Sequence, residues 1–423
     1  MKKAFAIILI LTGLMALWGC SARKNPSRPV IQSGTTWTGF VRSTILDTSA
    51  TLTDESSGRY LYVYVPPGYT ANETTYIRID TTYHVDSTYQ DTVWVFDSTL
   101  VTEVTNHDYP VLYLLHGYGG DYRYYHLIFN LTATLNEMIS SGEIDPMVVV
   151  VPDFSNRFGG SFYANSPVDT LPDSREVSFS GKFEDFFFEE LIPYVEQNFA
   201  VDTIASGRGI GGHSMGGYGA YRLAMRHPDM FGSVSAMSAP LYFNALPALL
   251  PAMFAENGFT PGDTAGFYAI APAATKRLTS MMFAMGAAFS PHKIADPDTT
   301  LFHRVRNVSF YFGVDLPFRI DGSIDSAFWA ANWLPNDPFT MLTQLGGATA
   351  LTGKHLYLDC GNADDLYLHL HNQAFSEALT AAGLTHVYHE YAGYSGNDAG
   401  HINFIADRLR EVFKFHSEAF AAE

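Results

Sequence analysis

The segment 212–217, Gly-His-Ser-Met-Gly-Gly, limits the possible folds of this chain more than any other feature, because it fits a Gly-x-Ser-x-Gly turn. The six residues before it end apolar, as a buried strand does, and residues 218–226 have helical character. Between a strand and a helix, this pattern holds the serine in a strained turn and exposes its hydroxyl. Side chains at Gly212 and Gly216 would collide with the backbone that approaches the turn. The motif therefore predicts Ser214 as a nucleophile.

A serine hydroxyl is a weak nucleophile, so the motif also predicts a histidine base and an acid elsewhere in the chain. Residues 355–361 and 385–391 form two further predicted strands, and His401 lies in the loop after the second. The order Ser, Asp, His along the chain is that of the α/β-hydrolase fold. We therefore expect His401 to take the proton of Ser214 and to return it to the leaving group.

The acid of this predicted triad has three candidates, because Asp359, Asp364 and Asp365 all lie near the end of the strand 355–361. Asp359 should still lie within the strand. Asp365 should begin the predicted helix 366–382, where a carboxylate is favourable as a cap. Asp364 is therefore the preferred acid, expected to orient the imidazole and to stabilise its charged form. Asp365 stays open as the alternative.

Four other histidines near the end of the chain compete with His401. His369 and His371 lie on the predicted helix at a spacing that separates their faces, and His386 and His389 lie within a predicted strand. None of these four falls in the loop after the last strand, where the fold requires the base.

The negative charge that develops on the substrate oxygen needs two backbone donors. One expected donor is the amide of Met215, directly after the serine. The other is expected from residues 116–120, His-Gly-Tyr-Gly-Gly, which follow the predicted strand 111–115. Tyr118 is the candidate within this loop, and we expect His116 to pack beneath it.

The remaining pattern predicts an α/β fold with a mostly parallel, doubly wound sheet and helices on both faces. Residues 37–46 and 59–65 alternate between apolar and polar side chains, which indicates two antiparallel strands. Residues 111–115 and 147–151 are continuous apolar runs, typical of strands covered on both faces. Residues 127–141 between them have helical character, and alternation of strands with helices favours a parallel sheet.

Two insertions interrupt this pattern. Residues 74–105 are rich in Thr, Asp, Tyr and Val and alternate in places, which predicts a β-hairpin arm that decorates the sheet edge. Residues 241–343 contain an apolar, Met-rich stretch at 281–285 and are expected as a cap over the active site. Met-rich stretches also occur in ordinary cores, so both interpretations of this insertion stay open. The whole of 36–423 is predicted to be one catalytic domain.

The start of the chain predicts export. A charged beginning is followed by an apolar run, 4–18, that is shorter than a membrane span and typical of a signal peptide. Residues 17–21, Leu-Trp-Gly-Cys-Ser, resemble the bacterial lipoprotein processing site, in which a cysteine becomes lipidated. We expect a signal peptide at 1–19, a lipid anchor on Cys20, a tether at 20–35 and a location at the outer membrane or cell surface. A periplasmic or secreted protein with an ordinary signal peptide is the alternative.

Charge and cysteine content argue against several functions. The chain has 25 basic and 43 acidic residues, a formal net charge of −18, which disfavours nucleic acid and anionic membrane surfaces as partners. It has two cysteines, one of them Cys20, so we expect no disulfide within the mature chain. His369 and His371 lack a third metal ligand at a useful spacing, and the glycines of 207–212 match a dinucleotide loop only in part. We expect neither metal nor organic cofactor, and the oligomeric state stays open.

Several motifs, spread over most of the chain from Tyr60 onward, point to one family. They are 62–69 (Tyr-Val-Tyr-Val-Pro-Pro-Gly-Tyr), 109–117 (Tyr-Pro-Val-Leu-Tyr-Leu-Leu-His-Gly), 183–186 (Phe-Glu-Asp-Phe), 190–194 (Glu-Leu-Ile-Pro-Tyr), 212–217, 360–364 (Cys-Gly-Asn-Ala-Asp) and 400–401 (Gly-His). Together these motifs resemble the esterase family that includes esterase D, feruloyl esterases and the mycolyltransferases of the antigen 85 group.

The resemblance implies hydrolysis of carboxylic esters without metal or organic cofactor, by a triad of Ser214, Asp364 and His401. It also implies Tyr118 and Met215 as the oxyanion donors. The predicted export favours extracellular substrates, such as feruloyl or acetyl esters on plant polysaccharide, and we expect turnover of small aryl acetates. An acyltransferase would share all these residues and is one alternative. A non-catalytic carbohydrate-binding surface protein is the alternative from another class.

Overall fold

The computed structural model describes residues 33–46, 58–85, 92–167, 181–292, 302–307 and 310–422. The predicted signal peptide, Cys20 and most of the predicted tether lie outside these residues. Among the helices in the described ranges, none combines the length and the apolar character that crossing a membrane requires.

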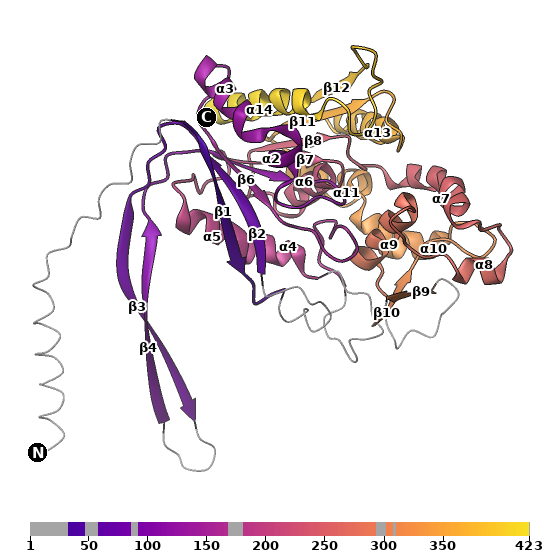
Figure 1. Cartoon of the computed structure of the whole chain (residues 1–423), viewed down its shortest axis with the longest axis horizontal. Coiled ribbons are helices and arrows are strands. Elements are labelled where there is room, and N and C mark those ends of the chain that lie inside the picture. The colour runs from indigo at the N-terminus through magenta and orange to yellow at the C-terminus, as the bar shows by residue number, and fades with distance from the viewer. Residues whose placement is uncertain are drawn as a thin grey trace, which may run out of the picture.

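A mostly parallel sheet of eight strands forms the centre of the molecule (Figure 1). Its strands are β1 (Thr35–Arg42), β2 (Gly58–Val65), β5 (Val111–Leu115), β6 (Val148–Pro152), β7 (Arg208–His213), β8 (Ser233–Met237), β11 (His355–Gly361) and β12 (Val387–Tyr391). They lie in the order β1-β2-β6-β5-β7-β8-β11-β12. β1 and β2 are antiparallel at one edge, and all pairs from β6 to β12 are parallel, so the predicted fold class is confirmed.

Helices cover both faces of this sheet because its central strands are apolar throughout. Residues alternate between the two faces along a strand. Leu112 and Leu114 of β5 therefore pack with α3 (Leu131–Ser141) and α14 (Ile405–Ala421), while Tyr113 packs in the core on the opposite face. The other helices around the sheet are α2 (Tyr124–Phe129), α4 (Phe183–Asp185), α5 (Ile192–Asn198), α6 (Met215–Arg226) and α13 (Leu368–Ala381), with a π-helical segment at Phe186–Leu191.

The first insertion is a hairpin arm made of β3 (Glu73–Val85) and β4 (Thr92–Val104). The two strands form a two-stranded sheet of their own that reaches away from the body (Figure 1). Pro66 and Pro67 end β2, and without N–H groups they cannot continue its ladder. The arm thus forms a ribbon of its own and adds no strand to the eight-stranded sheet. Its base lies against α5, where the Gln197 side chain donates to Glu103 over 3.2 Å.

The second insertion, 241–343, is mostly helical and lies beside the end of β7 that leads to Ser214 (Figure 1). It comprises the 3₁₀ segment η3 (Phe243–Leu249), α7 (Leu250–Asn257), α8 (Thr264–Tyr268), α9 (Arg277–Phe289), β9 (Phe302–Asn307), β10 (Phe310–Asp315), α10 (Ser326–Phe328), the π-helical η4 (Trp329–Trp333), the 3₁₀ segment η5 (Leu334–Asn336) and α11 (Pro338–Gln344); α12 (Gly347–Leu351) follows.

In two of the predicted helices, a residue with positive φ makes the observed bounds differ from the predicted ones. The helical region predicted at 127–141 is divided into α2 and α3 at Asn130, whose φ is 58°. The helix predicted from Leu366 begins only at Leu368, because Tyr367 before it has a φ of 57°. Asp365 therefore lies in a turn, and the prediction that it begins a helix is wrong.

Candidate active site

Ser214 occupies the sharp turn between β7 and α6. Its φ of 57° and ψ of −120° lie in a region that a residue with a side chain rarely adopts. A Cβ at Gly216 would overlap the carbonyl oxygen of Leu115, and a Cβ at Gly212 would lie 2.7 Å from the carbonyl carbon of Gly216. Both positions therefore exclude side chains, which explains the two glycines of the motif.

Three residues singled out in the sequence form one chain of hydrogen bonds. Nδ1 of His401 lies 2.8 Å from Oδ2 of Asp364, and Nε2 of His401 lies 3.0 Å from Oγ of Ser214. The residues follow β7, β11 and β12, whose carboxyl ends meet at one edge of the sheet. When Nδ1–H donates to the carboxylate, Nε2 is the nitrogen left to accept the serine proton. The arrangement can therefore activate the hydroxyl.

The carboxylate of Asp364 remains charged although it is buried. Burial alone would raise the pKa of Asp364, but the imidazole of His401 and two backbone amides outweigh this effect and hold the pKa below its ordinary value. The amides of Leu366 and Leu368 donate to Oδ1 over 2.9 Å and 3.5 Å. The same carboxylate therefore orients the imidazole and shapes the turn after β11.

The other two acid candidates have different partners. Asp359 lies within β11, as expected, and pairs with Arg408 of α14, whose Nε lies 2.9 Å from Oδ1. Asp365 is exposed, pairs with Arg277 over 3.1 Å and accepts the amide N–H of His401 over 3.2 Å. The structure thus brings neither of them to the imidazole.

His213, inside the serine motif, makes contacts that sequence analysis missed. Its Nε2 donates to the backbone carbonyl of His401 over 2.9 Å, and its Nδ1 accepts from the hydroxyl of Tyr124 over 3.1 Å. Burial, followed by the nearby His401, lowers the pKa of His213 well below its ordinary value, which agrees with a neutral ring that donates once and accepts once. The motif shows that a histidine stands here, but no spacing in the sequence reveals its partner.

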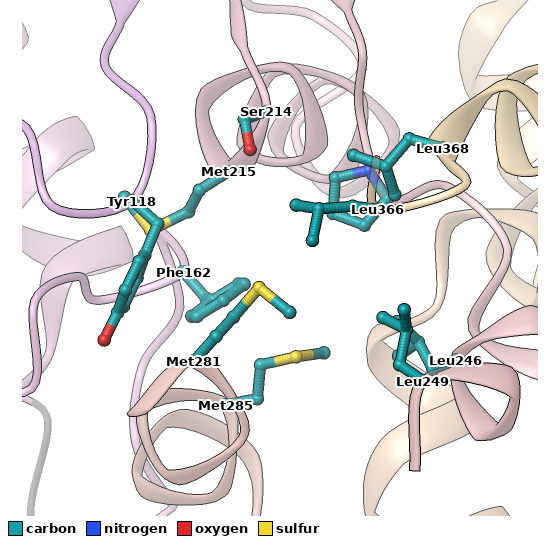
Figure 2. A pocket seen from close by; sticks show the side chains of 11 residues that line it. Tyr118, Phe162, Ser214, Met215, Leu246, Leu249, Met281, Met285, Leu366 and Leu368 are labelled. Atoms are coloured by element: carbon teal, nitrogen blue, oxygen red, sulfur yellow. The ribbon is translucent and has the colours of Figure 1, made fainter. Parts of the chain in front are cut away.

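Met215 and Tyr118, the expected backbone donors, both lie beside Ser214 (Figure 2). Met215 is the first residue of α6, and the first N–H groups of a helix have no partner within it. Two hydrogen bonds to residues 158 and 159 hold the loop that contains Tyr118. The Tyr118 hydroxyl donates to the carbonyl of Phe158 over 2.8 Å, and the amide of Gly119 donates to the carbonyl of Gly159 over 2.8 Å. The loop therefore meets the turn in a defined position.

His116 packs beneath this loop, as expected, and is buried. Its Nε2 accepts the amide of Phe154 over 2.9 Å, so its Nδ1 donates to the carbonyl of Gly117, also over 2.9 Å. Burial lowers the pKa of His116. The ring is thus a neutral support of the loop.

Two of the histidines that competed with His401 in the sequence have partners other than the serine. His371 is buried in α13, where burial lowers its pKa to about 3, and it accepts the amide of Tyr242 over 3.2 Å. His386 stands just before β12, contrary to the prediction, and bonds the hydroxyl of Ser376 over 2.7 Å. Within the described ranges no group of three or more His, Cys, Asp or Glu side chains is arranged to hold a metal ion.

Two cavities meet at Ser214. The first, called the apolar cavity, is lined by side chains that do not border the second: Phe162, Met215, Pro240, Leu246, Leu249, Met285 and Leu368. The second, called the polar cavity, is lined by Tyr124, His213, Arg277, His401 and Ile402. Tyr118, Met281 and Leu366 border both. The serine hydroxyl thus lies where two chemically different spaces join.

Comparison with known proteins relates this chain to esterases. The family model described as "Putative esterase" matches residues 102–407. An esterase of Mycobacterium tuberculosis is 33% identical over 132 residues, which cover 31% of this chain and 25% of the relative. The endo-1,4-beta-xylanase/feruloyl esterase of Xylanibacter ruminicola is 30% identical over 139 residues, which cover 32% of this chain and 17% of that protein. The chain therefore aligns with a quarter or less of each of these two relatives.

Solved structures support the fold along nearly the whole chain. A ferulic acid esterase superposes with a TM-score of 0.51 and 19% identity, covering 92% of this chain and 99% of its own. An S-formylglutathione hydrolase from Agrobacterium tumefaciens has a TM-score of 0.50 and 17% identity, with 93% and 98% covered. With the family model spanning most of the sequence and the sheet order observed here, the chain belongs to the putative esterase family and has its α/β-hydrolase fold.

Proposed function

We propose that this protein is a serine carboxylic-ester hydrolase that forms an acyl-enzyme. The observation that carries the proposal is the chain of hydrogen bonds from Asp364 through His401 to Ser214, at 2.8 Å and 3.0 Å. The strained turn that exposes the serine and membership of the esterase family support the same function.

In the first step, Oγ of Ser214 attacks the ester carbonyl carbon while Nε2 of His401 takes the hydroxyl proton. The π electrons of the carbonyl move to its oxygen, and the amides of Met215 and Tyr118 are the proposed donors to that oxyanion. When the carbonyl re-forms, the bond to the alcohol oxygen breaks and His401 gives that oxygen the proton. Water then attacks the acyl-enzyme by the same route, which releases the acid and restores the serine.

Feruloyl or acetyl esters on extracellular plant polysaccharide are the proposed natural substrates. The name of the Xylanibacter ruminicola relative supports this class, and so does the predicted export. The same proposal places the enzyme on a membrane by a lipid anchor at Cys20, on the evidence of the processing motif in the sequence.

A fluorophosphonate probe and a panel of esters test the proposed function. We expect the probe to label Ser214, and Ser214→Ala to lose labelling and to lower kcat by about 10⁶-fold. Ser140→Ala, on the exposed side of α3, is the matched control and should keep wild-type activity. Folded wild-type protein that neither labels nor hydrolyses any ester would overturn the proposal. Product analysis with an added acceptor alcohol separates a hydrolase from an acyltransferase.

A further inference from the structure

The position of His401 decides which side of Ser214 receives the alcohol part of an ester. When the acyl-enzyme forms, the alcohol oxygen takes its proton from Nε2 of His401, so the alcohol has to lie beside the imidazole. His401 borders the polar cavity and does not line the apolar one. The alcohol therefore leaves through the polar cavity, and the acyl group lies on the side of the apolar cavity.

The polar cavity opens to the surface of the protein. Two of the residues that border it, Arg277 and Ile402, are exposed: the Arg277 side chain by 52% and Ile402 by 64%. A polymer that is attached through the alcohol oxygen can therefore continue from this cavity into solvent.

One face of α9 follows both cavities. Arg277, Met281 and Met285 are spaced four residues apart on this helix, so they lie along one side of it. Arg277 lines the polar cavity, Met281 borders both cavities, and Met285 lines the apolar one, where both methionines point inward (Figure 2). The insertion thus places a cation on the alcohol side of the serine and apolar side chains on the acyl side.

Hydrogen bonds hold Arg277 in place at both its backbone and its side chain. The amides of the next two residues donate to the carboxylate of Glu256 over 3.0 Å and 2.9 Å, which fixes the start of α9. The Arg277 guanidinium donates to Oδ2 of Asp365 over 3.1 Å, and Oδ1 of Asp365 accepts the amide N–H of His401 over 3.2 Å. One carboxylate thus connects the guanidinium to the loop that carries His401.

The polar cavity offers both a donor and an acceptor to a ligand. A guanidinium carries five N–H donors, and the bond to Asp365 uses one of those of Arg277. The hydroxyl of Tyr124, which also lines this cavity, donates its proton to Nδ1 of His213, so its oxygen is left to accept. A hydroxyl group both donates and accepts. The two side chains therefore suit an alcohol that carries further hydroxyl groups.

Asp365 limits the charge that the polar cavity presents. Arg277 is the only Lys, Arg, Asp or Glu side chain that borders this cavity in the described part of the chain, and Asp365 balances its charge. An anionic alcohol would approach the exposed carboxylate of Asp365, in a protein whose formal net charge is −18. The site therefore fits neutral hydroxyl groups better than a carboxylate.

We propose that Arg277 is a specificity-determining residue that binds a hydroxyl group of a neutral sugar on the alcohol side of the ester, with Tyr124 as the accepting partner. The proposal rests on the ester hydrolysis proposed above and names the residues that recognise the polysaccharide. A hydrogen bond from a charged donor raises kcat/KM about ten- to hundredfold, and one to a neutral acceptor raises it about two- to tenfold.

Esters that share an acyl group and differ in the alcohol test this recognition. The pairs are feruloyl arabinofuranose with methyl ferulate, and acetylated xylobiose with ethyl acetate. We expect kcat/KM to be at least about tenfold higher for the sugar ester than for the simple ester. Equal values would overturn the sugar site while leaving ester hydrolysis intact. Absence of all ester cleavage together with an unlabelled Ser214 would overturn both the hydrolase and the sugar site.

An anionic sugar tests the charge argument. Acetylated digalacturonic acid should be cleaved less well than acetylated xylobiose, because its carboxylate meets Asp365. The reverse order would show that the site takes an anion, and the assignment to a neutral sugar would fail.

Substitutions in the polar cavity provide a second, independent test. Arg277→Ala should lower the ratio of sugar-ester to simple-ester kcat/KM at least about tenfold, and Tyr124→Phe should lower it about threefold. Arg319→Ala is the matched control and should leave the ratio unchanged. Arg319 is another exposed arginine of the insertion that pairs with an aspartate, Asp325, but it lines neither cavity.

Asp365→Asn separates sugar recognition from a purely structural ion pair. It removes the partner but keeps the guanidinium, so the ratio should stay within about threefold of wild type, and acetylated digalacturonic acid should be cleaved better than by wild type. The proposal would be overturned if Asp365→Asn lowered the ratio as strongly as Arg277→Ala, or if Arg277→Ala left the ratio unchanged.

Discussion

Asp359 within β11 and Asp364 just after its end are five positions apart and almost equally buried, yet their partners give them different uses. They are 1% and 2% exposed. Asp359 pairs with Arg408, and Asp364 pairs with His401. A guanidinium stays protonated at all ordinary pH values, whereas an imidazole exchanges its proton near neutrality. The arginine pair can only fix structure, while the histidine pair can also move a proton.

The two pairs lie in neighbouring segments of the chain. Arg408 lies in the first turns of α14, directly after the loop that carries His401. Asp359 lies in β11, directly before the turn that carries Asp364. The ion pair between Arg408 and Asp359 therefore joins the two segments whose relative position sets the 2.8 Å contact between imidazole and carboxylate.

The largest difference between the two aspartates should appear in the rate. Asp364→Asn is expected to lower kcat by about 10⁴-fold, because an amide beside Nδ1 no longer holds the imidazole in the tautomer that accepts the serine proton. Thermal unfolding should change by only a few degrees, since the amide oxygen can still accept the two leucine N–H groups. Steady-state kinetics with an aryl ester and circular dichroism measure both quantities.

Asp365→Asn is the control for that variant. Its carboxylate accepts the amide of His401 but does not touch the imidazole, so kcat should stay within about threefold of wild type. If Asp365→Asn lowered kcat as strongly as Asp364→Asn, the two acids could not be told apart by their contacts, and the assignment of Asp364 would fail.

Asp359→Asn should lower stability strongly and activity little, the reverse of what is expected for Asp364→Asn. Removal of the charge leaves the guanidinium of Arg408 buried without a counter-ion, which is expected to lower the free energy of unfolding by about 3–5 kcal/mol. Urea unfolding monitored by fluorescence measures this loss. The fraction that remains folded should still hydrolyse esters, and a folded but inactive variant would contradict the division between the two aspartates.

The sequence was sufficient to predict the parts of the site that local patterns encode. The turn at Ser214 depends on two glycines whose steric role follows from the motif alone. The order of Ser214, Asp364 and His401 follows from where strands end, because carboxyl ends of parallel strands meet at one edge.

The sequence was not sufficient where contacts join segments that no pattern links. His213 and the carbonyl of His401 lie 188 positions apart and meet only after the sheet has formed. The lining of the apolar cavity comes from η3, α9 and the turn after β11, and a Met-rich helix gives the same sequence pattern in a core or in a pocket. Asp365 lies in a turn because Tyr367 has a positive φ, and the sequence does not predict a positive φ at an aromatic residue.

Asp337 extends the comparison to a buried carboxylate whose hydrogen-bond donors within the described chain are neutral. It accepts the amide of Phe243 over 2.9 Å and both donors of Thr340, and burial raises its pKa to about 6 from an ordinary 3.8. Folding thus favours the protonated form, and this stabilisation is complete below pH 3.8 and lost as the pH rises through 6.

Asp337→Asn should remove that dependence, because an amide stays neutral throughout. The free energy of unfolding of the variant, relative to wild type, should therefore rise by about 3 kcal/mol between pH 4 and pH 7. Urea unfolding at a series of pH values measures the difference. If the free energies of unfolding of the variant and the wild type changed equally with pH, Asp337 would not titrate in this range.

Substitution of His213 should cause the smallest of the expected losses of kcat. It tests how the loop that carries His401 is held in position. His213→Phe keeps an aromatic ring but removes the donor to the carbonyl of His401 and the acceptor for Tyr124, so kcat is expected to fall about tenfold with KM little changed. His213→Gln can restore a donor and should recover part of the loss, which a purely structural role would not predict. If kcat were unchanged in both variants, the Arg408–Asp359 pair and the Asp365 contact would suffice to position the imidazole, and the neutral His213 would serve packing alone.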